Sequence, residues 1–244
     1  MSKTSFASNS VTGTKGDDFL FGDMQGSLVG NQTGGHDKLR GLGCNDVLFG
    51  DGTELHDDAI GGNDALLGGK GVDRIYGDAG DLWAHSTGGN DRLLGEAGDD
   101  VLHGDADAIR EDARGGNDRL EGGAGNDILL GDAFSLLGNA QGGDDWLNGG
   151  AGDDRLFGDA EFVFDSAQAG SDTFASIGTF GNDFVGDFRQ GEDKLEFNVK
   201  RVDNLSDLQI VTVGFNTVIT AEGYGTVTLA NFTGTLTNSD VLFV

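Results

Sequence analysis

Residues 115–130 read Gly-Gly-Asn-Asp-Arg-Leu-Glu-Gly-Gly-Ala-Gly-Asn-Asp-Ile-Leu-Leu, and this stretch decides the fold. It holds two copies of one motif: a Gly-rich turn, an aspartate that closes it, and an apolar residue two positions later. The closing aspartates along the chain are Asp18, Asp37, Asp46, Asp64, Asp73, Asp91, Asp100, Asp118, Asp127, Asp145, Asp154 and Asp172. From Asp37 onward, short and long steps between them alternate regularly, which predicts a coil with two strands in each turn.

A large apolar residue stands two positions after every closing aspartate, and we expect it to be the inward centre of a short strand. These residues are Leu20, Leu39, Leu48, Leu66, Ile75, Leu93, Leu102, Leu120, Leu129, Leu147, Leu156 and Phe174. The alternating spacing sorts the strands into two stacked parallel sheets. One contains the strands led by Asp18, Asp46, Asp73, Asp100, Asp127 and Asp154, and the other contains the remaining six. The sequence therefore predicts an all-β parallel roll with a leucine ladder inside it.

The connections between strands are of two kinds, which should form opposite edges of the roll. Short connections run from a strand directly through a Gly-rich turn, as in 122–127. Long connections begin Gly-Asp, end near Gly-Gly-Asn-Asp, and contain an insert between these two ends. The fourth residue of each insert is apolar (Leu55, Leu82, Ile109, Leu136, Val163), and the eighth is small (Ala59, Ser86, Ala113, Ala140, Ala167). This pattern predicts that the inserts stack in a further ordered column, the alternative being irregular loops.

Composition restricts both the fold and the partners. The 244 residues include 45 Gly, no Pro and a single cysteine, Cys44, and the formal net charge is −27. A lone cysteine cannot form an intramolecular disulfide, so something else must hold this Gly-rich, self-repelling chain together. The same charge disfavours nucleic acid as a partner. Residues 1–10 do not read as a cleaved signal peptide, and no apolar run is long enough to span a bilayer.

The repeated turn is suited to calcium, which takes six to eight oxygen ligands from carboxylates and carbonyls. Glycines allow a tight turn to direct its carbonyls toward one point, and stacked turns bring identical oxygens together. On the short edge the candidate ligands are the carboxylates of Asp18, Asp46, Asp73, Asp100, Asp127 and Asp154 with the turn residues Gly41, Gly43, Gly68, Lys70, Gly95, Ala97, Gly122, Ala124, Gly149 and Ala151. On the long edge they are Asp37, Asp64, Asp91, Asp118, Asp145 and Asp172, where the insert leaves the geometry open.

These residues resemble the repeats-in-toxin family, whose calcium-binding nonapeptides form a parallel β-roll. The resemblance covers Gly13 to about Ala175. Segments 170–174, 182–188 and 191–197 further resemble the C-terminal cap of secreted serralysin-like proteases. The resemblance implies several Ca²⁺ ions between turns, which are required for folding. The regular insert departs from the family pattern and puts the sites of that edge in doubt.

The C-terminal part has a different pattern. Segments 208–213, 216–221 and 226–230 are predicted strands that should cap the open end of the roll. We therefore expect an N-terminal tail at 1–12, the roll at 13–175 and a β-rich cap at 176–244. Residues Asp240 to Val244, an acidic residue followed by hydrophobic ones, resemble the uncleaved signal read by type I exporters, and an apolar terminal strand is the alternative. An extracellular, secreted protein is expected.

No catalytic motif is found in the sequence: there is no His-Glu-x-x-His and no Gly-x-Ser-x-Gly. The four histidines, His36, His56, His85 and His103, are interpreted as surface residues. The prediction is a non-catalytic structural, adhesive or interaction protein, whose partner could be a surface or matrix polysaccharide or another protein. Two alternatives stay open at this stage. One is a membrane-active, toxin-like protein, and the other is a polysaccharide-acting enzyme with a site in the long loops.

One surface of the predicted roll is unusually apolar. The residues that flank the inward leucines of the sheet led by Asp18 include Phe19, Phe21, Val47, Phe49, Tyr76, Val101, Ile128, Leu130 and Phe157. A soluble monomer rarely leaves so large an apolar strip exposed. We expect the inserts to fold back over it, with their fourth residues as the covering column. The alternative is that the strip binds a partner.

Overall fold

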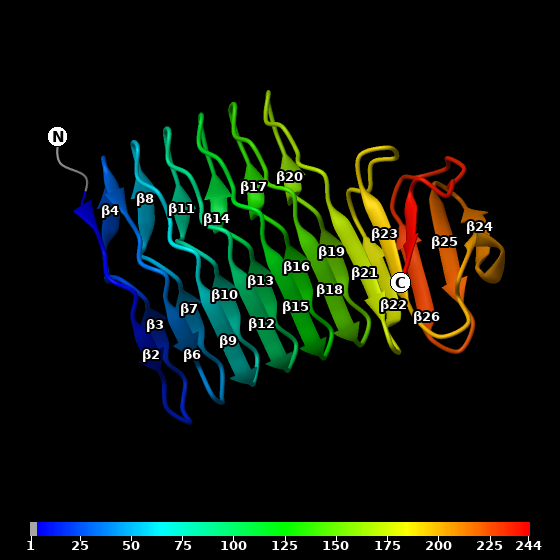
Figure 1. Ribbon diagram of the computed structural model, residues 1–244, viewed down its shortest axis with the longest axis horizontal. Helices are drawn as coiled ribbons and strands as arrows, with labels where there is room; N and C mark the ends of the chain where they lie inside the picture. The colour runs from blue at the N-terminus through cyan, green and yellow to red at the C-terminus, as the bar shows by residue number, and fades with distance from the viewer. Residues whose placement is uncertain (1–3) are drawn as a thin grey trace.

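A computed structural model describes residues 4–244, which wind into a parallel β-roll (Figure 1). Successive turns follow one another along the long axis, from the N-terminal strands to the C-terminal hairpin. Each turn of the repeat region adds one strand to each of two facing sheets, and a third strand comes from the insert. The predicted all-β parallel roll is confirmed, since equivalent strands of neighbouring turns pair in parallel and in register.

The first sheet contains the short strands that follow the short edge. They are β3 (Phe19–Phe21), β7 (Val47–Phe49), β10 (Arg74–Tyr76), β13 (Val101–His103), β16 (Ile128–Leu130) and β19 (Arg155–Phe157). All pair in parallel and in register, so that Leu129 lies between Leu102 and Leu156. The Gly-Asp dipeptide that ends each strand is thereby repeated at one edge of the sheet.

The second sheet contains the strands that follow the long edge. They are β2 (Ser10–Thr12), β6 (Lys38–Arg40), β9 (Ala65–Lys70), β12 (Arg92–Ala97), β15 (Arg119–Ala124), β18 (Trp146–Ala151), β21 (Thr173–Ile177), β23 (Lys194–Asn198) and β27 (Val241–Phe243). The pairing is again parallel, and Leu120 lies between Leu93 and Leu147. Four of these strands have six residues because their ladder continues into the short-edge turn.

The leucine ladder forms the core between the two sheets. Leu39, Leu66, Leu93, Leu120 and Leu147 of the second sheet join the apolar residues of the first sheet in one cluster. All five are fully buried, and burying one such side chain contributes about 1.5–3 kcal/mol. A strand of three residues has no stability alone, and so each turn depends on its neighbours.

The inserts form a third parallel sheet, which we call the insert sheet. Its strands are β4 (Ser27–Val29), β8 (Glu54–His56), β11 (Asp81–Leu82), β14 (Ala106–Ile109), β17 (Ala133–Leu136) and β20 (Ala160–Val163). Figure 1 shows these strands side by side, offset from the two main sheets. Single bridges continue the ladder on the way back, from Thr33 through Arg114 to Gln168. The predicted ordered column is confirmed.

The insert sheet has its own small core, and it does not cover the apolar strip in the predicted way. Leu55, Leu82, Ile109 and Leu136 pack with the alanines of the inserts in a cluster that contains no residue of the strip. Because the alanine side chains are small, each turn has room for one large apolar side chain, and the fourth residue of the insert packs there. Val163 in the last insert is exposed. The prediction that these residues form the covering column is therefore wrong.

The exposure of the apolar strip depends on the position of the residue in its strand. The third strand positions, Phe49, Tyr76, His103, Leu130 and Phe157, are buried. Val47, Val101 and Ile128 at the first positions are half-buried, and Phe19 at the first turn is exposed. The rings of Phe49, Tyr76 and His103 form a stacked column with centroids 4.7 Å apart at each step. Aromatic stacking along the turns thus shields much of this surface.

The two main sheets continue through the C-terminal part. β22 (Gly181–Val185) pairs with β19, while β21, β23 and β27 extend the second sheet. An antiparallel hairpin, β24 (Gln209–Val213) and β25 (Asn216–Ala221), and β26 (Gly225–Leu229) complete the first sheet at this end, preceded by a 3₁₀ helix at Leu205–Asp207. The strands predicted here agree within a few residues.

The domain division stays a prediction, although strand pairing crosses both of its boundaries. At the N-terminal end β1 (Thr4–Ser5) pairs with β5 (Gln32–Thr33), and β2 pairs with β6, so pairing begins before residue 13. Residues 1–3 of the predicted tail lie outside the described residues. At the other end both main sheets pass residue 175 without interruption.

The insert sheet yields a stability prediction. In the calcium-loaded protein, Leu136→Ala should cost about 2–5 kcal/mol because its side chain is fully buried against the alanines. Phe134→Ala in the same strand should cost less than half as much, since Phe134 is 40% exposed. Denaturant titration of both variants measures the difference. Equal small losses would show that the inserts contribute no packed core.

Candidate metal centres at the edges of the roll

The short-edge turn is shaped by left-handed backbone positions that recur once per turn. Gly123 (φ 115°) and Gly125 (φ 143°) illustrate the two positions, which only glycine adopts at little cost. Non-glycine residues occupy the position of Gly123 in two other turns, at Leu42 and Glu96. A side chain at Gly122 would collide with Asp127 Oδ2 and with the Gly149 carbonyl of the next turn. The turn therefore gathers a carboxylate oxygen and a carbonyl oxygen from successive turns at one point.

The closing aspartates of the short edge form a ladder along the roll. The backbone N–H of Asp73 donates to Asp100 Oδ1 at 2.7 Å, and that of Asp100 donates to Asp127 Oδ1 at 2.8 Å. The other oxygen, Oδ2, is buried and has no hydrogen-bond partner in Asp46, Asp73, Asp100, Asp127 and Asp154. A buried carboxylate oxygen without a partner is costly, and a cation bound there would remove the cost.

The other predicted ligands of the short edge differ among themselves. The carbonyls of Ala97, Ala124 and Ala151 each accept an N–H from the glycine one turn earlier, which uses one lone pair. Those of Gly41, Gly68, Gly122 and Gly149 lie against the glycine of the preceding turn, beside its closing carboxylate. Asp18 is half-buried, and its Oδ2 accepts hydrogen bonds from Thr14. The first turn thus presents a more open arrangement than the others.

The long edge contains the same ladder. The N–H of Asp91 donates to Asp118 Oδ1 at 2.7 Å, and the pattern repeats from Asp37 to Asp172. Oδ2 is again buried without a partner in Asp37, Asp64, Asp91, Asp118 and Asp145. The insert, which made this edge doubtful in the sequence, leaves the ladder intact because its own sheet keeps the register of the two main sheets.

A second set of aspartates on the long edge was not among the predicted ligands. We call Asp51, Asp78, Asp105, Asp132 and Asp159 the Gly-Asp aspartates, since each follows the glycine that ends a first-sheet strand. All five are buried. Each accepts the N–H of the glycine two positions before the closing aspartate of the long edge, as Asp105 does from Gly116 at 2.9 Å. The signal in the sequence was the Gly-Asp dipeptide itself, repeated once per turn.

Burial raises the pKa of these carboxyl groups in the cation-free chain. The pKa of Asp64 is raised to about 9 by burial, and the neighbouring Asp78 carboxylate adds to the shift. On the short edge burial raises the pKa of Asp127 to about 7 and that of Asp73 to about 6. The pKa values of Asp105 and Asp132 are also raised by burial. The fold thus disfavours the ionised form of the aspartate carboxyl groups at both edges unless a cation is supplied.

Protein cations are almost absent from the edges. Among residues 4–244, the only ion pairs of closing or Gly-Asp aspartates are those of Arg189 with Asp159 and Asp172. Nor do three or more His, Cys, Asp or Glu side chains in this part of the chain form a group that could hold a metal ion by themselves. A metal ion at either edge would therefore take most of its ligands from carbonyls and water, as calcium readily does.

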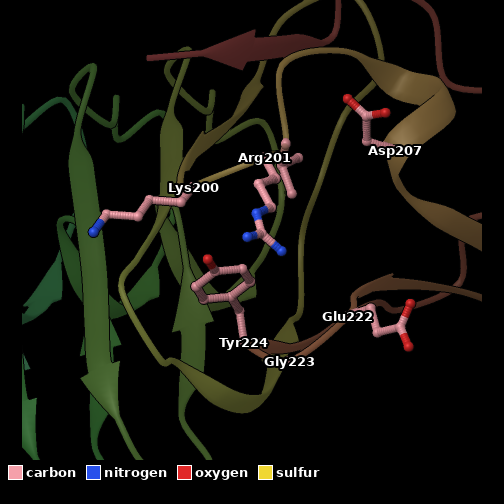
Figure 2. Close-up of a pocket in the computed structure, with 7 residues that line it drawn as sticks. Lys200, Arg201, Asp207, Glu222, Gly223 and Tyr224 are labelled. Atoms are coloured by element: carbon pink, nitrogen blue, oxygen red, sulfur yellow. The ribbon is translucent and has the colours of Figure 1, made fainter.

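Two hollows lie away from the aspartate ladders. The larger, of about 690 Å³, is in the C-terminal part. Figure 2 shows Arg201 and Tyr224 directed toward one another there, while Lys200, Asp207 and Glu222 extend apart. The smaller, of about 290 Å³, we call the outer groove. It is lined by residues of the first sheet and of the insert sheet, among them Arg74, Asp107, Phe134 and Glu161.

His103 corrects one sequence prediction. It borders the outer groove but is buried, unlike His36 and His85, which are exposed as predicted. His103 occupies the third position of its strand, in register with Tyr76 and Leu130 of the neighbouring turns. Side chains at this position are buried in the first sheet, and the ring of His103 continues the aromatic column. Burial lowers the pKa of His103 to about 3, so the ring is neutral at physiological pH.

The fold and its acidic edges define an acidic parallel β-roll, and comparison with known proteins gives its family. The chain matches the RTX calcium-binding nonapeptide repeat over residues 5–24, 33–52, 58–81, 84–108, 112–135 and 139–161. These segments cover more than half of the 244 residues, and the chain belongs to this family. Its repeats bind calcium, and its members are typically secreted proteins.

Other comparisons add little. No curated protein matches the chain. Among solved structures it is similar to the extracellular lipase LipA from Serratia marcescens, with 18% identity and a TM-score of 0.39 over 96% of this chain. The chain spans 40% of the length of that lipase. Within the described residues, no helix is long and apolar enough to cross a membrane.

The ladder predicts different outcomes for two aspartates in one turn. Asp100→Ala removes the acceptor of the Asp73 N–H and an unpartnered oxygen, and should cost about 1.5–3 kcal/mol in calcium. Asp107→Ala, on the exposed side of the insert, should leave the calcium titration unchanged. Calcium-dependent refolding followed by circular dichroism compares them. If the two titrations coincide, the short-edge ligands are assigned wrongly.

The raised pKa values predict an inverted pH dependence for the metal-free protein. An unfolded aspartate has a pKa of about 3.9. Folded pKa values of about 6 to 9 mean that the folded chain binds more protons across this interval. The stability of the metal-free roll should therefore fall as the pH rises from about 4 to 9. Circular dichroism after exhaustive dialysis tests this, and a gain of β structure with rising pH would contradict it.

Proposed function

We propose that this protein is a secreted calcium-binding roll that folds when it meets calcium outside the cell and has a non-catalytic structural, adhesive or interaction role. The observation that carries the proposal is the buried Oδ2 atom without a partner, repeated at both edges in successive turns. A family whose repeats bind calcium supplies the cation that fits it.

The expected free energy of calcium binding supports the proposal that the chain folds when calcium binds. A net charge of −27 opposes compaction of the metal-free chain. A site whose dissociation constant lies about tenfold below the ambient calcium concentration contributes about 1.4 kcal/mol. Five such sites would contribute about 7 kcal/mol, which is comparable with the stability of a whole domain. Calcium binding is then large enough to decide whether the roll is folded.

The residues proposed to hold calcium on the short edge are the closing aspartates from Asp46 to Asp154 together with turn carbonyls such as those of Gly68 and Gly149. Carbonyl oxygens from one turn and a carboxylate from the preceding turn adjoin each other there. Calcium would supply positive charge and link neighbouring turns. The closing aspartates of the long edge are proposed ligands for the same reason.

Export is proposed to precede folding. Val241 lies in β27, paired with β23, and both Asp240 and Val241 are buried. Leu242 and Val244 remain exposed, so a type I signal in residues 240–244 would be accessible along its whole length only while the chain is unfolded. A low calcium concentration inside the cell would keep it so, and extracellular calcium would complete the fold after export.

The outer groove is the proposed interaction surface. Arg74, Asp107 and Glu161 supply charged groups around it, and Phe134 presents a partly exposed ring. A partly exposed ring beside charged groups suits a ligand such as a polysaccharide, which can stack on the ring and form hydrogen bonds with the charged groups.

Chelation tests the proposal directly. In excess chelator at neutral pH the protein should show little β signal by circular dichroism, because the charge repulsion is unbalanced. Addition of calcium should restore the signal cooperatively, and magnesium at the same concentration should be less effective, since it requires stricter octahedral geometry. A full β spectrum in excess chelator would refute calcium-dependent folding.

A further inference from the structure

One arginine at the C-terminal end of the long edge provides a positive charge next to its buried carboxylates. Arg189 Nη2 lies 3.2 Å from Asp159 Oδ2 and 3.8 Å from Asp172 Oδ2. The same atom lies 3.3 Å from Asp193 Oδ1 and donates to the Gly170 carbonyl. A Gly-Asp aspartate and the closing aspartate of one turn thus converge on a single positive group.

The preceding turn contains the same two carboxylates without that group. Register places Asp132 one turn before Asp159, and Asp145 one turn before Asp172. Oδ2 is buried without a partner in both Asp132 and Asp145. These are the equivalents of the atoms that Arg189 contacts in the last turn.

Earlier turns repeat the arrangement in part. Asp51 Oδ1 and Asp64 Oδ2 are likewise buried without partners. In the two turns between, Asp91 Oδ2 and Asp118 Oδ2 have no partner, whereas both oxygens of Asp78 and of Asp105 accept a glycine N–H. Successive Gly-Asp carboxylates are also close to each other. A side chain at Gly115 would clash with Asp132 Oδ1 on one side and approach Asp105 Oδ2 on the other. Carboxylates packed in this way repel each other strongly in a low-dielectric interior.

The path of the chain differs at the last turn, and this difference brings Arg189 to the carboxylates. Each of the Gly-Asp aspartates is followed by an insert, whereas Asp187, next after Asp159 in the first sheet, is followed by a short turn that reaches Asp193. Arg189 lies in this turn, and its side chain reaches the carboxylates of the preceding turn. The last turn therefore receives its positive charge from the protein.

We propose that the Gly-Asp aspartates, which the repeat motif does not include, are additional ligands in the row of divalent cations proposed for the long edge, and we call this row the file. One hard cation such as Ca²⁺ binds per turn between the Gly-Asp aspartate and the closing aspartate, in the pairs Asp51–Asp64, Asp78–Asp91, Asp105–Asp118 and Asp132–Asp145. Arg189 ends the file by taking the place of the cation at Asp159–Asp172. This inference rests on the proposed calcium-dependent folding and extends it to residues outside the repeat motif.

Counting bound ions by native mass spectrometry of the full chain in calcium tests the file. Asp132→Asn removes one charge yet retains an acceptor for the Gly143 N–H, and it should lose one calcium ion. Arg189→Gln opens the last position and should gain one ion. Asp107→Asn, in an insert but outside the file, is the matched control and should keep the wild-type count.

The outcomes separate this inference from the proposed function. An unchanged count in Asp132→Asn would overturn the file. If that variant does not fold at high calcium, Arg189→Gln decides: one additional ion supports the file, and an unchanged count overturns it. Asp100→Asn on the short edge should also lose one ion. If it does not, calcium binding by the nonapeptide turns fails, whatever happens on the long edge.

Discussion

The structure depends on the burial of carboxylates at both edges of the roll with almost no basic side chains to balance them. Each closing aspartate from Asp37 to Asp154 uses one oxygen to bind the backbone of the preceding turn and leaves the other buried without a partner. The first oxygen fixes the register of the turns. The second creates a need for positive charge, which a divalent cation meets with little added volume. The register and the proposed metal requirement thus come from the same residue.

The leucine ladder and the edges depend on each other. Strands of three residues have one inward side chain per turn, such as Leu129, and the sheets form only when turns are stacked. Stacking brings the aspartates into line, so the gain from apolar burial is opposed by charge repulsion. A roll of this kind is suited to the proposed switch, in which the concentration of a bound cation would determine whether apolar burial prevails.

Most of the fold could be predicted from the sequence because the repeat couples spacing to chemistry. The alternation of short and long steps assigned strands to two sheets, and the apolar and small positions of the inserts indicated a third column. The direction of the insert leucines could not be predicted, since it depends on alanines such as Ala113 and Ala140 meeting them across the insert. Continuation of both main sheets past residue 175 was also hidden, because β22 and β23 lack the glycine turns of the repeat.

The candidate sites could be predicted only in part. The closing aspartates are marked by the motif, and the structure aligns them as expected, but their role as ligands stays a proposal. The Gly-Asp aspartates carry the same residue type at the same period, yet their burial follows from the path of the insert, which the sequence does not give. Arg189 could not be found at all, since no spacing or motif in the sequence links it to Asp159.

A crystal structure grown in calcium, with an anomalous difference map collected at long wavelength, tests the central claim most directly. The account predicts peaks that recur once per turn at both edges, each beside an Oδ2 atom that has no partner within the protein, and none at Arg189. Peaks confined to exposed carboxylates on the surface, with the buried aspartates paired to one another through protons, would contradict it.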